Sequence, residues 1–548
     1  MAEKTGIRKW LPLVVLVLAL FIIVLDTTII NVSMKAIITD LHTNLKAVQW
    51  VITGYSLTLA AFTITGGRLG DIFGRKRMFR VGALVFALGS LFASQAHSQP
   101  ELLAAVALVE GVGAAMMMPS TAALILAEYQ GKDRAVAFGM FGAAAGTAAT
   151  VGPLLGGFLT TNYSWRWNYL INPFVVVALL LGSRLLHESH VRTPHKPDLA
   201  SILLSALGLA GVVYGIIESS TYGWLKAKNS YEIFNHHYTL GGASITVYAL
   251  VIGIVFLVGF LWRQRLLEQK GEMPLVSLGI FKNRQFMAGS TVTMIVAMTQ
   301  FGFIFILPVF LQGMLGKDAF HTGLSLLPFS LSVMVAGPLS GILVGKANVA
   351  PKFMIQLGLV ISVLGAFLLR QEFSDTATAT TIMPGQVVFA IGFGLAFSQL
   401  ANLTLSAVSV QQAGEASGLN NTLRQVGASL GQALIGALLI SALLTQLNTD
   451  VSASKVLPAS SRSHIAADVA SSAESLGTAN GNVQQLPAPI THEITRIKND
   501  AIIKGVRTGL IATIGVAIIA LVVSTQLPWR PHQAADMDRP KKPASAGA

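Results

Sequence analysis

Two acidic residues, Asp26 and Glu110, stand within long apolar stretches of the sequence, where ionisable groups are rare. On membrane-insertion scales an ionisable group inside a span costs about 2.5–3.5 kcal/mol, so each is a functional candidate. In apolar surroundings a carboxylate favours its protonated form, and a second carboxylate nearby strengthens this preference. Such a pair is expected to hold a proton near neutral pH and to release it when a cation arrives. The alternative is that each acid only bonds a neighbouring Ser, Thr or Asn and thereby joins two helices.

The composition indicates which elements must position these acids. Of the 548 residues, 53% are hydrophobic and only 11% are charged, whereas soluble proteins carry about a quarter charged residues. A larger core does not explain this deficit, because soluble domains stop growing at about 250–300 residues. A lipid-facing surface does explain it. The chain is therefore predicted to be an all-α polytopic membrane protein.

Fourteen segments approach the length of about 20 apolar residues that a membrane-spanning helix needs. They are 11–33, 47–69, 78–96, 102–127, 135–160, 167–187, 199–218, 240–262, 286–312, 322–345, 352–370, 381–408, 416–446 and 506–527. Asp26 then lies about 10 Å below the outer end of the first span, and Glu110 lies about 12 Å below the outer start of the fourth. The two acids are thus expected at a similar depth.

The basic residues indicate the orientation. An even number of spans puts both termini on one side, and about two thirds of the 38 Lys and Arg fall on the side of the N-terminus. Because basic residues accumulate in short cytoplasmic loops, this favours an N-in, C-in protein of the inner or plasma membrane. The net charge of +13 is explained in the same way, so no nucleic-acid partner is expected. The first apolar run is too long for a signal peptide and has no small-residue cleavage site.

Motifs of soluble enzymes are missing from the sequence. It has no cysteine, nucleotide-binding loop, G-x-S-x-G elbow, H-E-x-x-H sequence or metal-ligand cluster. The chain is therefore predicted not to be an enzyme and to need no cofactor other than the proton as a coupling ion. The long outer loop, 448–505, is rich in Ser and Ala and too plain for a sensor domain. Near its end Ile490, Ile494, Ile497 and Ala501 recur at helical spacing, which predicts an amphipathic helix that caps the outer surface or assists substrate exit.

A charged motif lies where the second span meets the cytoplasm. Residues 67–77 read GRLGDIFGRKR, with glycines that allow two helices to approach closely and a carboxylate followed by three basic residues. This spacing closely resembles the loop motif of the major facilitator superfamily. Within the fifth span, residues 142–157 (GAAAGTAATVGPLLGG) are similar to the signature of that superfamily's exporters. The motif positions with a predicted role are Gly67, Asp71, Gly74, Arg75 and Arg77 for gating, and Gly146, Gly152, Pro153, Gly156 and Gly157 in the exporter signature.

Shorter stretches narrow the resemblance to the fourteen-helix drug:proton antiporter subfamily, and they extend it over essentially the whole chain. They are 25–32 (LDTTIINV), 165–167 (WRW), 171–173 (INP), 414–418 (GEASG) and 424–425 (RQ). The resemblance implies two six-helix bundles, residues 1–190 and 271–548, with two inserted helices and a linker at 191–270. It also implies alternating access, in which the bundles rock about a site at the midplane.

The same resemblance implies roles for individual residues. Asp71 would pair with Arg75 and dock against the N-terminus of the thirteenth helix, where the helix dipole favours an anion. Glu415 and Arg424, at the start of that helix, are expected to act as gate residues. Asp26 and Glu110 would share the central cavity with Tyr55, Met117, Gln300, Phe301, Gln399 and Asn402. The alternative for these six is that they are ordinary packing residues.

The chain departs from the family pattern in three places. Ala107 stands where the helix-four motif of the family has an arginine, and Glu110 stands where it has a glutamine. The first helix continues to Lys35 without the usual A-L-P ending, and the second copy of the loop motif, at 341–346, has lost its acid. The first departure matters most, because that arginine is expected to help move protons in the family.

The predicted function is proton-coupled antiport of lipophilic, cationic drugs and biocides by a multi-pass transporter that acts as a monomer in the lipid bilayer. The alternative is a dedicated exporter of one metabolite, lipid or antibiotic. A membrane enzyme or sensor is a third class, which the absence of enzyme motifs disfavours.

Overall fold

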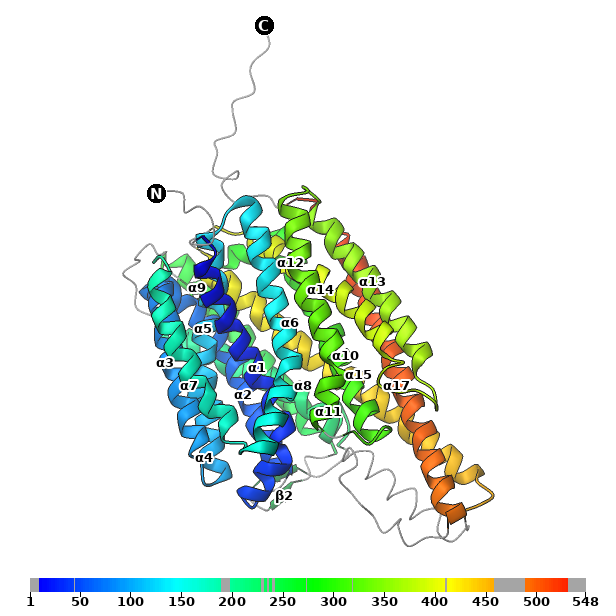
Figure 1. Ribbon diagram of the computed structural model, residues 1–548. Helices are drawn as coiled ribbons and strands as arrows, with labels where there is room; N and C mark the ends of the chain where they lie inside the picture. The colour runs from blue at the N-terminus through cyan, green and yellow to red at the C-terminus, as the bar shows by residue number, and fades with distance from the viewer. Residues whose placement is uncertain are drawn as a thin grey trace.

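Long helices make up nearly all of the secondary structure in the computed structural model (Figure 1). The structure describes residues 9–43, 45–188, 198–227, 231–233, 236–238, 242–272, 274–317, 319–409, 412–457 and 488–530. Figure 1 shows the described helices running side by side, with the start of α1 and the end of α17 at the same end of the bundle. We call this the inner end, because it is the predicted cytoplasmic side.

The first half of the chain forms a continuous series of helices. These are α1 (Leu11–Asp40), α2 (Leu45–Phe73), α3 (Arg75–Ser94), α4 (Gln99–Leu103), α5 (Gly111–Glu128), α6 (Gly131–Asn162) and α7 (Trp167–Gly182). A π-helical segment over Ala104–Glu110 joins α4 to α5, and a 3-10 turn over Ser183–Leu185 ends α7. π-Helical turns are rare and often occur at functional sites. Glu110 is the last residue of this one.

The rest of the chain begins with two helices and a short hairpin, and seven further helices follow. They are α8 (Leu199–Tyr222), β1 (Tyr231–Ile233), β2 (His236–Tyr238), α9 (Ile245–Gln269), α10 (Arg284–Gly313), α11 (Ala319–Ser325), α12 (Leu327–Gly345), α13 (Pro351–Glu372), α14 (Met383–Leu405), α15 (Ala413–Ala453) and α17 (Ala488–Ser524). β1 and β2 pair antiparallel, with Tyr231 opposite Tyr238. A 3-10 turn over Leu278–Lys282 precedes α10.

Twelve helical segments of the described chain are long and apolar enough to cross a membrane, and the bent helix α6 makes a thirteenth if it counts as one span. The all-helical, membrane-spanning class is therefore confirmed, whereas the count of fourteen remains a prediction. The predicted span at 47–69 lies in α2, which is not among these segments. It packs against α5, α8 and α15 and buries polar side chains such as Thr58, Thr63 and Thr65.

Two interfaces join the halves of the chain. α2 packs along α15, and α6 packs along α12 and α11. α8 and α9 form a pair, and α8 also touches α2 and α15. The outer face of α9 exposes apolar side chains, including Val255, Val258 and Trp262, as expected for a helix in lipid. The division into two six-helix bundles with two inserted helices agrees with these contacts and remains a prediction.

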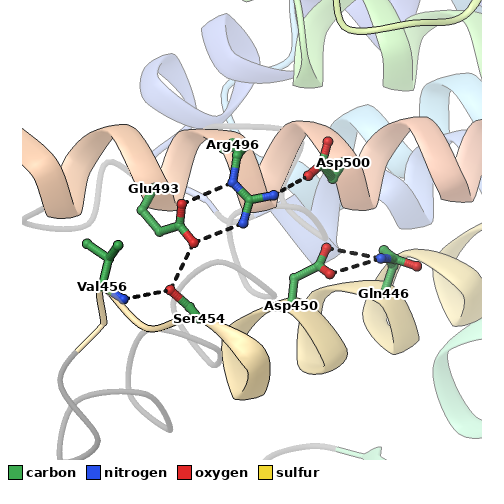
Figure 2. Close-up of polar contacts among 7 residues, drawn as sticks. All are labelled: Gln446, Asp450, Ser454, Val456, Glu493, Arg496 and Asp500. Carbon is green, nitrogen blue, oxygen red and sulfur yellow. Dashed lines mark hydrogen bonds and ion pairs between the residues drawn. The ribbon is translucent and has the colours of Figure 1, made fainter.

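α15 and α17 extend beyond the other helices at the lower right of Figure 1. The predicted amphipathic helix is confirmed as the first turns of α17, where Ile494, Ile497 and Ala501 are buried. Figure 2 shows the polar side chains of this extension. Ser454 Oγ after α15 donates to Glu493 Oε1 on α17 (2.8 Å), and Arg496 binds the same carboxylate at 2.9 Å. The outer loop is therefore helical at both of its ends, while 458–487 lie outside the described residues.

Candidate functional site

The two predicted acids meet at one amide. The Asn172 Nδ2 of α7 donates to Asp26 Oδ1 of α1 at 3.1 Å and to Glu110 Oε1 at 3.2 Å. The same nitrogen lies 2.6 Å from Ser90 Oγ of α3, and this hydroxyl in turn donates to Glu110 Oε1. Four elements that are distant in sequence therefore converge on a single polar cluster. We call Asp26, Ser90, Glu110 and Asn172 the acid cluster.

Close helix packing positions the acid cluster. A Cβ built at Gly89 would lie 2.4 Å from the backbone nitrogen of Glu110, so only glycine allows α3 to approach the π-helical turn this closely. On the other face of the turn, a Cβ at Gly54 would lie 2.9 Å from the Cβ of Ala107. The position at which the family has an arginine is therefore packed directly against α2. A long side chain at Ala107 would have to displace that helix.

The acid cluster is sealed from solvent and lacks a counter-ion. Glu110 is 0% exposed and Asp26 is 4% exposed. Within the described residues no Lys, Arg or His forms an ion pair with either carboxylate. A buried carboxylate without a cation is costly in its charged form. Among the described residues, Glu110 Oε2 and the hydroxyl groups of Tyr55 and Tyr169 have no hydrogen-bond partner.

Asp26 faces a small cavity, and Glu110 lies behind it. The lining of this cavity includes Asp26, Thr27 and Ile30 of α1, Tyr55 of α2 and Tyr169 of α7. Glu110 does not line it, and Asn172 joins Glu110 to Asp26, which does. The cluster thus has one acid in contact with the cavity and a second acid two hydrogen bonds away from it, through the Asn172 amide.

At the inner end, a second acidic group joins the two halves. Arg75 Nη2 and Nε donate to Asp71 Oδ1 at 2.9 and 3.1 Å, and the Glu415 backbone N–H at the start of α15 donates to Asp71 Oδ2 at 3.1 Å. The predicted contact of Asp71 with Arg75 and with the N-terminus of this helix is therefore present. The Glu415 side chain accepts from Ser277 N and Ser277 Oγ, which ties the linker before α10 to the same point.

The glycines of the loop motif explain the closeness of this contact. A Cβ at Gly67 would lie 2.3 Å from the Gly414 carbonyl oxygen, so α2 and α15 meet backbone to backbone. Gly74 has φ of 104°, a conformation that L side chains rarely adopt, and it turns the chain between α2 and α3. Arg77, two residues after Arg75 in the same motif, is exposed. The contact joins α2 of one half to α15 of the other at the inner end.

The exporter signature lies where α6 bends by 40°. The break between residues 148 and 151 falls where Pro153 cannot donate a hydrogen bond to the preceding turn. Gly152 faces α1, where a Cβ would lie 1.9 Å from Thr28 Oγ1. Gly146 faces Val333 of α12 and Gly157 faces Phe320 of α11, whereas Gly156 is simply buried. The signature thus lets α6 pack against helices of both halves at once.

A second cavity lies between the halves, and Arg424 of α15 belongs to it. Its lining includes Phe141 of α6, Thr293 of α10, Phe397 of α14, and Asn420, Asn421 and Arg424 of α15. Arg424 was predicted as a gate residue beside Glu415. It lies nine residues after Glu415 on α15, and the structure places it among the cavity walls.

The remaining predicted site residues do not gather around either of these two cavities. Met117 packs toward α3, where a Cβ on Gly82 would lie 3.0 Å from its Cγ, and its neighbour Met118 lines the second cavity instead. Asn402 Nδ2 donates to Gln399 Oε1 at 3.2 Å. Gln399, Asn402, Gln300 and the half-buried Phe301 lie outside both linings.

Asn172, Ser90 and Tyr169 were missed as site residues. Asn172 lies in the I-N-P stretch that supported the resemblance, and an amide inside an apolar span was the available signal. Ser90 gave no such signal, because a hydroxyl in a membrane helix commonly bonds its own backbone.

This fold is that of a multi-pass membrane protein, and comparison with known proteins defines the family. A model of the Major Facilitator Superfamily matches residues 16–432. The chain is 32% identical over 432 residues to puromycin resistance protein pur8 of Streptomyces alboniger, covering 78% of this chain and 81% of that protein. It is 29% identical over 553 residues to the probable actinorhodin transporter of Streptomyces coelicolor (95% and 92% covered). It is 28% identical over 523 residues to the multidrug efflux pump LfrA of Mycolicibacterium smegmatis (95% and 96% covered).

Solved structures agree with the fold. The human organic anion transporter MFSD10 aligns with a TM-score of 0.55 at 11% identity, covering 95% of this chain and 100% of that one. A bacterial homologue of the human lysosomal transporter Spinster aligns with a TM-score of 0.54 at 16% identity, covering 96% and 100%. The chain belongs to the major facilitator superfamily. It is a membrane transporter and not an enzyme.

Proposed function

We propose that this transporter exports lipophilic, drug-like compounds, cations among them, in exchange for protons. The observation that carries the proposal is the acid cluster, in which two buried carboxylates share one amide without a cation among the described residues. Several relatives are named as multidrug efflux or antibiotic resistance proteins, which supports export of this class of compound. The protein is proposed to work as a monomer, with both termini in the cytoplasm and fourteen spans.

The two acids have different roles in this proposal. Asp26 lines the cavity and would meet a cationic substrate directly, whereas Glu110 would act through Asn172. Two carboxylates this close titrate as a unit, so the pair would retain one proton in the absence of substrate. The positive charge of a cation in the cavity would stabilise the ionised carboxylates, so the pair would release its proton. Opening to the outer, more acidic side would restore the proton and expel the substrate.

The inner-end contact of Asp71 with Glu415 N–H supplies the gate in this proposal. It bonds a side chain of the N-terminal half to the backbone of the C-terminal half, so it must break when the cavity opens inward. Alternating access would then consist of making and breaking this contact while the halves rock about the cavities.

The test measures proton release by the purified protein when ethidium, a lipophilic cation, is added. The native chain is expected to release protons, Asp26→Asn to release none, and Glu110→Gln to release fewer. Glu101→Gln is the matched control, because Glu101 lies on the same run of helix but is exposed. In proteoliposomes with an imposed pH gradient, Glu110→Gln should reduce export of ethidium more than export of a neutral dye. Proton release by Glu110→Gln equal to that of the native chain would show that Glu110 is only structural.

A dedicated exporter of one compound is the second candidate. It is favoured by relatives named for single compounds, among them the tetracenomycin C resistance and export protein of Streptomyces glaucescens, which is 28% identical over 436 residues. Expression in a host without its own efflux pumps separates the two. Modest protection against many dyes and biocides indicates a multidrug exporter, whereas one large protection indicates a dedicated one.

A further inference from the structure

The second cavity is lined by a buried cationic side chain, Arg424, which is not part of the acid cluster. Arg424 is only 9% exposed and lines this cavity. Within the described part of the chain, no carboxylate forms an ion pair with its guanidinium and no acceptor receives a hydrogen bond from it. A charged residue buried in a membrane protein without a partner is expensive, and such residues mark substrate or ion pathways.

The neighbours of Arg424 are suited to a ligand oxygen and an aromatic ring. Asn420, Asn421 and Thr293 place amide and hydroxyl groups around the same cavity, and Asn420 Oδ1 has no partner among the described residues. Phe141 and Phe397 supply aromatic walls from opposite halves of the protein. Guanidinium groups bind carboxylates in a bidentate manner, with two parallel charge-assisted hydrogen bonds.

We infer that the second cavity is a binding subsite for the acidic group of an aromatic substrate, with Arg424 as the residue that binds its carboxylate or phenolate. The inference rests on the proposed export function and narrows the substrate class to aromatic compounds that carry an acid. A compound with both charges would place its cation toward Asp26 and its acid at Arg424. Helix α1 contributes to both cavities, since Leu20 lines the second and Asp26 lines the first.

The location also explains why the subsite would be used during transport. The cavity is lined by α1, α5 and α6 from one half and by α10, α14 and α15 from the other. A ligand held there touches both halves, and its affinity therefore changes when they rock apart. In the conformation described here the side chains leave room only for a small group, so a large dye must enter when one side opens.

The test uses two dyes that differ only in the acid. Rhodamine B carries a cationic ring system and a free carboxylate, and its ethyl ester carries the same ring system without the acid. Binding of each dye to purified full-length protein in detergent is followed by fluorescence anisotropy. The native chain is expected to bind the acid more tightly than the ester by about 10- to 100-fold, the factor of one charge-assisted hydrogen bond. Arg424→Gln should abolish this preference while the affinity for the ester changes by less than threefold.

Two further variants complete the design. Arg424→Lys keeps the charge but cannot donate in a bidentate manner, so it should retain part of the preference for the acid over the ester. This variant provides a measurement if Arg424→Gln does not fold. Arg184→Gln removes an exposed arginine at the inner end and should leave the preference unchanged. Equal binding of the two dyes by the native chain, or an equal loss of both in Arg424→Gln, would overturn the subsite. Because binding in detergent needs no proton gradient, this result is independent of whether ethidium export is proton-driven.

Discussion

Replacement of Asp71 by Asn weakens a hydrogen bond that crosses between the halves at the inner end. The bond from Arg75 to Asp71 lies within the N-terminal half and survives any rocking motion, whereas the bond from Glu415 N–H to Asp71 does not. Asn keeps the size and one acceptor oxygen of Asp but removes the charge. The substitution therefore weakens the closed inner end and leaves the local packing in place.

The magnitude follows from the geometry. A hydrogen bond to a charged group contributes about 1.5–3 kcal/mol, and the N-terminus of α15 adds a favourable dipole interaction of about 0.3–1 kcal/mol. Losing most of the hydrogen-bond contribution shifts the equilibrium between closed and open inner ends by about 10- to 100-fold toward open. Because transport requires both conformations in turn, export should fall while the protein still reaches the membrane.

The chain has no cysteine, so two introduced ones can be labelled without background. Cysteines at Arg184 and Lys346, exposed positions at the inner ends of the two halves, would report the distance between the halves by single-molecule energy transfer. Asp71→Asn should enrich the long-distance population. Asp133→Asn is the matched control, because Asp133 pairs with Lys9 at 2.6 Å within one half and is 40% exposed. An unchanged distance distribution in Asp71→Asn, or an equal shift in Asp133→Asn, would refute the gating role.

Two more predictions concern packing and pH. Gly152→Ala should lower the melting temperature in detergent and impair export, because its Cβ would lie 1.9 Å from the hydroxyl of Thr28 on α1. Gly515→Ala is the control. It adds a carbon with no other atom within 4 Å and should leave the melting temperature and export unchanged. The Arg263 side chain donates to Asp198 and holds the pKa of that carboxyl at about 2, below its ordinary value of 3.8. Its stabilisation of the α8–α9 pair is therefore present at neutral pH and is lost only as pH falls from about 4 toward 2. Melting curves of the native chain and Asp198→Asn should accordingly differ by a constant amount between pH 8 and 5, and a difference that vanishes across that range would contradict the assignment.

Local pattern was sufficient for most of the architecture and for part of the site. Apolar runs of membrane length predicted the helices, and counting residues from the span ends predicted that Asp26 and Glu110 lie at one depth. The spacing of the 67–77 motif predicted the pairing of Asp71 with Arg75. These properties depend on rise per residue, hydropathy and short-range spacing, which a linear chain carries in full.

Four of the expected cavity residues show where such reasoning ends. Gln300, Phe301, Gln399 and Asn402 lie on helices α10 and α14, which do line the second cavity, yet the cavity is faced instead by Thr293, Phe397, Leu400 and Ala401 of those helices. Each residue turns the side chain by about 100° around the helix axis. Which side chain faces a cavity therefore depends on the rotation of the whole helix against its neighbours.

The sequence alone thus determined that the chain is a multi-pass helical protein with two acids at one depth and a charged motif at a helix end. Only the tertiary structure decided that Asn172 joins those acids, that Ala107 is packed against Gly54 with no space for an arginine, and that Arg424 lines a cavity between the halves. The physical reason is that these three facts arise from contacts between helices distant in the chain. Such contacts depend on how small residues let the backbones approach, and no periodicity within one helix records them.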